Sequence, residues 1–222
     1  MSELILEQET FTYSELTPVA QSAAFEQWNS NVEVFDDWHE CVYEDWKGKL
    51  GERGVTDVEI SFSGFYSQGD GACFIGSIDL RELLEWEHQN NPEHSMALKY
   101  SPIYISQINI NPGEWANFNI KLVRGGGSNH YSHENTVSIE SELECSSEEL
   151  EGELSQHWYD GEYSGSHSCL ETEILELCRN WMKEIYKDLE ADYNYYFSQE
   201  CFDEECSNED WTFTEDGELI ED

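Results

Sequence analysis

The segment "CLETEILELCRNWMKEIYKDLEADYNYYF", residues 169–197, contains the clearest helical pattern of the chain. Apolar side chains recur there at intervals of three and four, and the opposite side carries glutamates, aspartates and two lysines. The apolar stripe consists of Leu170, Ile174, Leu177, Trp181, Ile185 and Leu189. Such a stripe is typical of a helix that packs on a core, so we predict a long helix near the C-terminus.

Helices are also predicted on the N-terminal side of this segment, where capping residues precede periodic apolar residues. In "YSELTPVAQSAAFEQWN", Ser14 or Thr17 can cap the helix, and Pro18 suits its first turn. Asp79 is placed to cap another helix. The predicted helices cover residues 13–29, 34–50, 79–89 and 146–158.

The apolar period changes to two between these helices, which indicates strands. In "VTDVEISFSGF", residues 55–65, the side chains of Val58, Ile60 and Phe62 fall on one face. The predicted strands cover residues 55–65, 72–78, 103–110, 115–123 and 135–143, with a hairpin in 211–220. We therefore predict a single α+β domain over residues 1–222, in which N-terminal helices and the long helix pack on a mostly antiparallel sheet.

Charge is the most unusual property of the composition, with 49 acidic residues against 10 basic ones and a formal net charge of −39. Such a field disfavours nucleic acid and anionic membranes as direct partners, because both are polyanions. It favours a basic partner, such as the DNA-binding surface of another protein. The acidity is concentrated in a C-terminal part that begins at about residue 140, where 27 acidic residues accompany 3 basic ones.

The sequence offers no signature of an enzyme, a metal centre or a cofactor. His130 and His133 are three residues apart in a segment that alternates like a strand, so their side chains are expected to face opposite ways. Cys201 and Cys206 lack the paired close spacing of a zinc site. Nucleophile-elbow, HExxH and Walker motifs are absent from the sequence. The N-terminus lacks a secretory pattern, no apolar run reaches about 20 residues, and the seven cysteines have no framework spacing. We therefore predict a cytoplasmic protein without catalytic residues, metal or cofactor.

The glycine-rich stretch "FSGFYSQGDGACF", residues 62–74, lies between two predicted strands and allows two interpretations. Its glycines can supply positive φ angles for a bulge and a turn. Alternatively, Gly69, Asp70 and Gly71 form a ligand loop whose backbone amides bind an anion. A phosphate loop of the Walker type needs a following lysine and helix, whereas a strand follows here, so the turn is favoured.

Several segments together resemble one family of small tailed-phage proteins, sometimes labelled antitoxin-like. They are "YSELTPVAQSAAFEQW", "FSGFYSQGDGACF", "NHYSHENTVSIE", "WMKEIYKDLEADYNYYFS" and "WTFTEDGEL", which occur in this order over most of the chain. The resemblance implies a phage protein that acts in the cytoplasm of a bacterial host, and it implies no catalytic residues. Residues 140–153 and 200–210 are more acidic than the family pattern.

The leading hypothesis is an acidic inhibitor that mimics DNA and blocks a host DNA-binding or anti-phage defence protein. A duplex of about 40 Å carries about 24 phosphate charges, and the net charge from residue 140 onward is also −24. The carboxylates predicted to contact the partner are Glu171, Glu173, Glu176, Glu184, Asp188, Glu190 and Asp192 on the long helix, and Glu200, Asp203, Glu204, Glu205, Glu209 and Asp210 after it.

Three alternatives remain open at this point. One is a neutraliser of a single protein that recognises its partner by shape, with aromatic anchors at Trp158, Tyr159, Tyr163, Tyr195 and Tyr196. Another is a small-ligand binder or enzyme that uses the Gly69–Gly71 loop. A third is adaptation to high salt, which also produces acidic surfaces poor in lysine.

Overall fold

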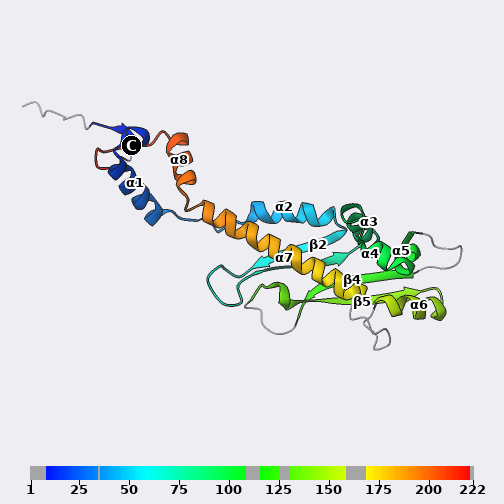
Figure 1. The fold of residues 1–222 in the computed structure, drawn as a ribbon. Helices are drawn as coiled ribbons and strands as arrows, with labels where there is room; N and C mark the ends of the chain where they lie inside the picture. Colours follow the sequence, from blue (N-terminus) through cyan, green and yellow to red (C-terminus); the bar gives the residue numbers. More distant parts are fainter. Residues whose placement is uncertain (1–8, 35, 109–115, 126–130, 159–168, 221–222) are drawn as a thin grey trace, which may run out of the picture. The chain divides into compact units, whose positions relative to one another are not determined.

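The chain forms two compact units in the computed structural model (Figure 1). The central unit comprises Glu40–Asp188, and the terminal unit combines Met1–His39 with Leu189–Asp222. The structure describes residues 9–34, 36–108, 116–125, 131–158 and 169–220. The sequence predicts one domain over residues 1–222, whereas the contacts of the structure divide the chain because its two ends pack together.

A four-stranded antiparallel sheet in the order β2-β3-β4-β5 forms the base of the central unit. Its strands are β2 (Val55–Phe62), β3 (Ala72–Ile78), β4 (Ala116–Arg124) and β5 (Val137–Cys145). β4 alternates strictly, since Phe118, Ile120 and Leu122 are buried while the residues between them are exposed. The α+β class and the antiparallel sheet predicted from the sequence are thus confirmed.

Helices of the central unit bury their apolar residues in the same core as the sheet. They are α2 (Glu40–Gly51), α3 (Leu80–Asn90), α4 (Met96–Lys99), α5 (Ser101–Ile108), α6 (Glu148–Trp158) and the long helix α7 (Leu170–Tyr195), whose last turns belong to the terminal unit. Asp79 caps α3 as predicted, with its Oδ1 accepting from the Glu82 amide at 3.0 Å. The predicted stripe of α7 is buried except at Leu177, where the neighbouring Cys178 points inward instead.

The strand predicted over residues 103–110 is wrong, because residues 101–108 form helix α5. Alternating isoleucines suggested a strand, but so short an apolar run fits both periods. The helix starts directly after α4, and Pro102 occupies its first turn, where a missing N–H is tolerated. The Tyr104 amide donates to the Tyr100 carbonyl at 3.1 Å, and Ile103 is fully buried. Packing therefore decided between the two periods.

The guanidinium of Arg53 lies among three tryptophans that come from three helices of the central unit. Its Cζ is 5.3 Å from the ring centroid of Trp46 on α2, 5.0 Å from Trp86 on α3 and 4.8 Å from Trp181 on α7. Burial lowers the pKa of this guanidinium, although the neighbouring carboxylate of Glu184 opposes the shift. Each ring face attracts the cation, so one side chain connects α2, α3 and α7.

The terminal unit is built from both ends of the chain around an aromatic core. Its elements are β1 (Phe11–Thr12), η1 (Tyr13–Glu15), α1 (Pro18–Asn31), α8 (Gln199–Asn208), β6 (Thr212–Phe213) and β7 (Leu219–Ile220). The strands form a small antiparallel sheet in the order β1-β6-β7, which confirms the hairpin predicted in residues 211–220. Thr17 caps α1 and Pro18 occupies its first turn, as the sequence predicts.

Phe202 on α8 is the centre of this core and is fully buried. Its ring centroid is 5.0 Å from that of Tyr13, 5.2 Å from that of Trp28, 6.2 Å from that of Trp211 and 6.5 Å from that of Phe213. No helix was predicted from the sequence at the position of α8. Ser198 caps it by accepting from the Cys201 amide at 3.1 Å, and Phe202 and Cys206 lie one turn apart on its buried side.

We predict that Arg53→Ala lowers the free energy of unfolding by about 2 kcal/mol or more, because it removes three cation–π contacts and leaves space among the rings. Urea unfolding followed by far-UV circular dichroism measures the change. Arg81→Ala is the control, since the Arg81–Glu85 ion pair is exposed and surface ion pairs contribute little to stability. Equal losses in both variants would contradict a special role for Arg53.

Gly217 tests the packing of the terminal unit. Its φ is +90°, and a Cβ at this position would lie 2.2 Å from the carbonyl oxygen of Ala20 on α1. We expect Gly217→Ala to destabilise the terminal unit by about 2 kcal/mol or more, seen as faster hydrogen exchange in α1 and α8. The control is Gly48→Ala on α2, where a Cβ meets nothing within 4 Å and the free energy of unfolding should stay equal or rise. Unchanged exchange in the Gly217 variant would refute the packing argument.

Candidate functional site

The two units differ sharply in charge. All ten lysines and arginines belong to the central unit, whereas the terminal unit carries 21 of the 49 acidic residues and no lysine or arginine. The sequence places the acidity in a C-terminal part from about residue 140. Folding regroups it, because acidic residues before His39 join those after Leu189 in one unit.

The carboxylates predicted to bind a partner are divided between the two units. Glu171, Glu173, Glu176, Glu184 and Asp188 lie in the central unit, and Glu190, Asp192, Glu200, Asp203, Glu204, Glu205, Glu209 and Asp210 lie in the terminal unit. Those that are partly buried are Glu171, Glu173, Asp192 and Glu205, and the others are exposed. Burial raises the pKa of the Glu171 and Asp192 carboxyls.

Two of the central-unit carboxylates have internal roles. Glu173 Oε1 accepts from the Tyr100 hydroxyl at 2.9 Å and also binds the ammonium of Lys99. Asp188 Oδ2 accepts from Trp46 Nε1 at 2.9 Å and so ties α7 to α2. These two side chains stabilise the central unit, which makes them weaker candidates for partner contacts than the terminal carboxylates.

Five exposed carboxylates of the terminal unit lie on α8 and directly after it. Glu204 Oε2 accepts from the Tyr195 hydroxyl at 2.7 Å, and this hydrogen bond raises the pKa of Tyr195 to about 12. Asp203 Oδ1 accepts from Gln199 Nε2 at 2.7 Å, which orients it on the helix surface. Glu200 and Glu204 lie one turn apart, at the spacing of about 5–6 Å between side chains on one helix face. The helix therefore presents a row of oriented negative charges.

A pocket of about 560 Å³ opens in the terminal unit beside α8. Trp28, Phe202, Trp211 and Phe213 contribute its aromatic walls. The carboxylates of Glu33 and Glu205 also line it, and Glu205 Oε2 accepts from Trp28 Nε1 at 2.9 Å. The sequence named Glu205 as a candidate, but it did not indicate the pocket, whose walls come from both ends of the chain.

The aromatic anchors proposed from the sequence lie in different surroundings. Trp158 is fully buried, packs on Phe118 with ring centroids 5.0 Å apart, and donates to Ser141 Oγ at 2.8 Å. Its selection as an exposed anchor is therefore wrong, because it completes the core under α6. Tyr195 and Tyr196 are partly buried and their ring centroids are 6.3 Å apart. The other two anchors, Tyr159 and Tyr163, lie outside the described residues.

The glycine-rich stretch forms a turn that its own aspartate stabilises. Asp70 Oδ2 accepts from the amides of Tyr66 at 2.8 Å and Ser67 at 2.6 Å. The φ angles of Gly64 and Gly69 are +82° and +99°, which only glycine adopts readily. These contacts favour the turn over the alternative of a ligand loop at Gly69, Asp70 and Gly71.

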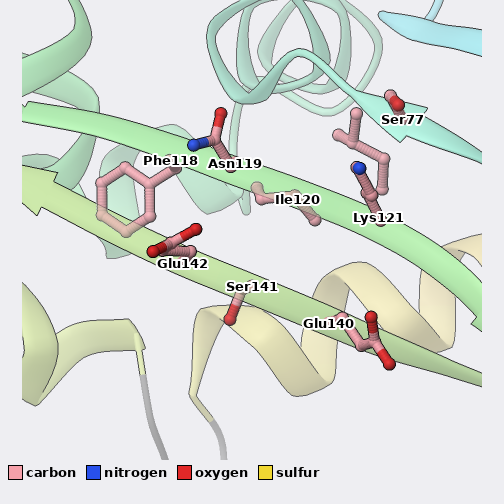
Figure 2. Close-up of a pocket in the computed structure, with 9 residues that line it drawn as sticks. Ser77, Phe118, Asn119, Ile120, Lys121, Glu140, Ser141 and Glu142 are labelled. Carbon is pink, nitrogen blue, oxygen red and sulfur yellow. The ribbon is translucent and has the colours of Figure 1, made fainter.

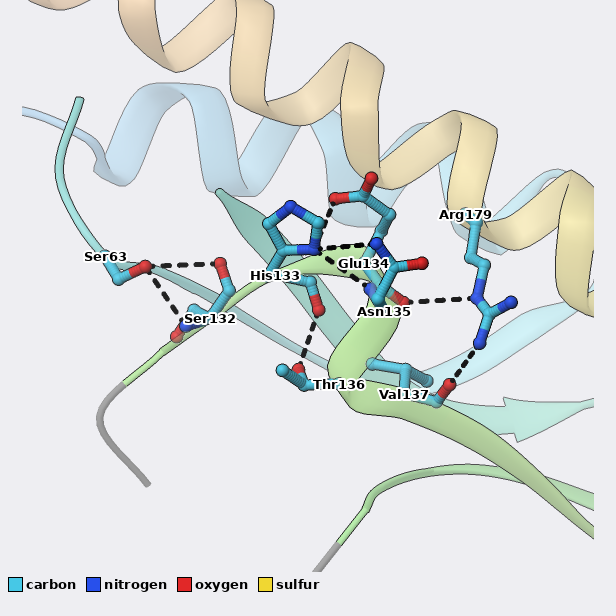
Figure 3. Close-up of polar contacts among 8 residues, drawn as sticks. All are labelled: Ser63, Ser132, His133, Glu134, Asn135, Thr136, Val137 and Arg179. Carbon is cyan, nitrogen blue, oxygen red and sulfur yellow. Dashed lines mark hydrogen bonds and ion pairs between the residues drawn. The ribbon is translucent and has the colours of Figure 1, made fainter. Parts of the chain in front are cut away.

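This turn packs against residues 131–136, which precede β5 (Figure 3). These residues belong to a different motif of the sequence. Ser63 Oγ accepts from the Ser132 amide at 3.1 Å, and a Cβ on Gly71 would approach the His133 ring to 3.0 Å. Arg124 Nη2 donates to Ser132 Oγ at 2.7 Å and to Cys73 Sγ at 3.4 Å. Hydrogen bonds thus join the glycine-rich stretch to the segment around Ser132 within the central unit.

The same hydrogen-bond network extends to α7. Arg179 donates from Nε to the Glu134 carbonyl at 3.3 Å and from Nη2 to the Val137 carbonyl at 3.1 Å (Figure 3). His133 Nδ1 lies 3.0 Å from Glu134 Oε2 and accepts from the Asn135 amide at 3.2 Å. These side chains connect loops to a helix, so the arrangement is that of a structural support.

A second hollow, of about 600 Å³, lies on the sheet of the central unit (Figure 2). β4 and β5 place Lys121 opposite Glu140 and Asn119 opposite Glu142. Among the residues that line it, the single cation therefore faces a carboxylate in the strand register, a pairing typical of antiparallel surfaces. This hollow suits an anion poorly, and we do not assign it a ligand.

Comparison with known proteins bears on the central unit. The family model described as a domain of unknown function (DUF8835) matches residues 38–199. Searches of curated proteins and of solved structures found no match. The match spans the central unit and α7, and it leaves out α1, most of α8 and the β6–β7 hairpin. Because it covers well over half of the sequence, the chain belongs to the DUF8835 family.

Proposed function

We propose that this protein is an acidic inhibitor that binds a basic, nucleic-acid-binding protein through its terminal unit. The observation that carries the proposal is the charge of this unit, which has 21 acidic residues and no lysine or arginine. A surface without cations offers no local repulsion to the arginines and lysines of a DNA-binding groove. The same surface repels nucleic acid itself, so the partner is a protein.

The charge density of the terminal unit supports DNA mimicry. A duplex segment with 21 phosphate charges is about 36 Å long. The terminal unit combines 39 residues from one end of the chain with 34 from the other. A compact unit of this size has a radius of gyration of about 11 Å by the usual scaling. Its diameter is therefore roughly 30 Å, so its charge per unit length is of the order found in DNA. The carboxylates of α8 supply part of this charge, and in the proposed complex they take the place of phosphates.

The setting of this interaction follows from the resemblance of the chain to tailed-phage proteins. It suggests that the partner is a DNA-binding or anti-phage defence protein in the cytoplasm of the bacterial host. Among the residues that the structure describes, no helix combines the length and hydropathy needed to cross a membrane. An anionic membrane surface is also a poor partner for a chain of this charge.

We predict that neutralising the five exposed carboxylates on α8 and directly after it abolishes capture of the partner. The test variant carries Glu200→Gln, Asp203→Asn, Glu204→Gln, Glu209→Gln and Asp210→Asn, all at exposed positions. The control removes five exposed charges from the central unit, with glutamine at Glu140, Glu142, Glu144, Glu149 and Glu153. Tagged proteins are incubated with bacterial lysate at 50 mM and 300 mM salt, with and without duplex DNA, and bound proteins are quantified by mass spectrometry.

The expected result is capture of basic proteins by the wild type and the control, displaced by DNA and at least tenfold weaker at 300 mM salt. The terminal variant should lose this capture at both salt concentrations. Equal losses in both variants would refute the assignment to the terminal unit. A single partner that survives high salt and ignores DNA would overturn mimicry and favour the shape-specific neutraliser.

Salt dependence of folding separates the proposal from simple salt adaptation. Repulsion among the terminal carboxylates is screened as the Debye length falls from about 30 Å at 0.01 M to about 8 Å at 0.15 M. We expect amide exchange in α8 to slow over this range while exchange in β3 changes less. The terminal unit should be folded by 0.15 M salt. A requirement for molar salt would contradict the proposal and indicate adaptation to a saline environment.

A further inference from the structure

The aromatic pocket of the terminal unit has the composition of a receptor for an organic cation. Its lining includes the buried rings of Phe202 and Phe213 and the partly exposed rings of Trp28 and Trp211. Aromatic faces attract cations, and a volume of about 560 Å³ falls within the usual range for ligand pockets. Val32 and Leu219, which also line the pocket and are partly exposed, suit an aliphatic stem.

Carboxylates at the pocket set the sign of the ligand. Glu33 and Glu205 line it, and the terminal unit has no lysine or arginine to neutralise them. The hydrogen bond from Trp28 Nε1 uses Oε2 of Glu205 and fixes the carboxylate beside the indole. An anionic group would therefore be repelled, and a neutral apolar group would leave both carboxylates without a cationic partner.

The central unit shows how this chain accommodates a cation among aromatic rings. There the guanidinium of Arg53 lies 4.8–5.3 Å from the centroids of three tryptophans. The terminal unit has a comparable group of rings, with two carboxylates added, but its own sequence provides no arginine. Arginine suits such a site better than lysine, because its planar head stacks on rings, pairs with a carboxylate in two-pronged geometry and is less strongly hydrated.

We propose that the pocket receives the side chain of an arginine from the basic partner. This inference rests on the proposed function and adds an anchoring contact to it. The guanidinium lies between the indole faces of Trp28 and Trp211 and pairs with Glu205, and the aliphatic stem covers the partly exposed side chains of Val32 and Leu219. Long-range attraction by the carboxylates would then bring the partner to the surface, and the pocket would fix its position.

The test compares two probes that differ in charge and hardly in shape, Nα-acetyl-arginine methylamide and Nα-acetyl-citrulline methylamide. Binding to the full chain is followed by the indole N–H resonances in ¹H–¹⁵N NMR, assigned with Trp→Phe variants. We expect saturable millimolar binding of the arginine probe, with shifts at Trp28 and Trp211 and none at Trp158. The citrulline probe should bind at least tenfold more weakly. Equal binding of both probes, or shifts confined to other tryptophans, would overturn the inference.

Two glutamates of the terminal unit provide a matched pair of variants. Glu205→Gln keeps an acceptor for Trp28 Nε1 but removes the charge, so we expect at least fivefold weaker binding of the arginine probe. Glu215→Gln removes the same charge from an exposed side chain that neither lines the pocket nor belongs to the proposed partner-binding carboxylates, and should change binding less than twofold. Equal effects would show that general electrostatics, and not the pocket, holds the probe.

The outcomes also separate this inference from the proposed function. If the arginine probe fails to bind while the five-carboxylate variant still loses its lysate partners, the pocket inference is wrong and the acidic inhibitor stands. If the probe binds but that variant captures partners normally, the inhibitor proposal is wrong and the arginine-binding pocket stands. If Glu205→Gln loses the arginine probe and the five-carboxylate variant loses its lysate partners, the pocket inference and the inhibitor proposal are both supported.

Discussion

Burial of Phe202 is the constraint on which the terminal unit depends. Its ring contacts aromatic side chains from η1, α1 and the segment after α8, and together these rings enclose much of the core. The two-residue pairing of β1 with β6 is by itself too short to hold the two ends of the chain together, so the packing around Phe202 is needed as well. The grouping of acidic residues and the aromatic pocket are both consequences of this one packing arrangement.

The few cations of the chain serve mostly internal contacts. Arg53 lies among tryptophans, Arg124 donates to Ser132, and Arg179 donates to backbone carbonyls. Four more basic residues form ion pairs with acidic side chains, namely Lys47, Lys49, Arg81 and Lys99. Most of the basic side chains therefore make contacts within the central unit. None of the lysines and arginines belongs to the terminal unit, so its formal side-chain charge at pH 7 is entirely negative.

Local signals in the sequence were sufficient for some elements and insufficient for others. The caps at Thr17 and Asp79 and the alternation of β4 could be predicted because each depends on residues only a few positions apart. Helix α5 could not, because packing against its neighbours chose between two periods that fit the same isoleucines. Individual carboxylates of α8 were recognised, but the pocket brings residues 24–33 together with residues 202–219, and no local pattern encodes that contact.

The pairing of β1 with β6 joins residues 11–12 to residues 212–213, so almost the whole chain separates the two halves of the terminal unit. During synthesis, α1 leaves the ribosome long before its partner α8 is made. Until then, the side chains of Phe25 and Trp28 on α1 stay exposed to solvent. The central unit can fold in the meantime from its own contiguous segment. The terminal unit can therefore form only after β6 and β7 have been synthesised. A chain that ends before α8 contains the family domain but lacks the acidic surface of the terminal unit.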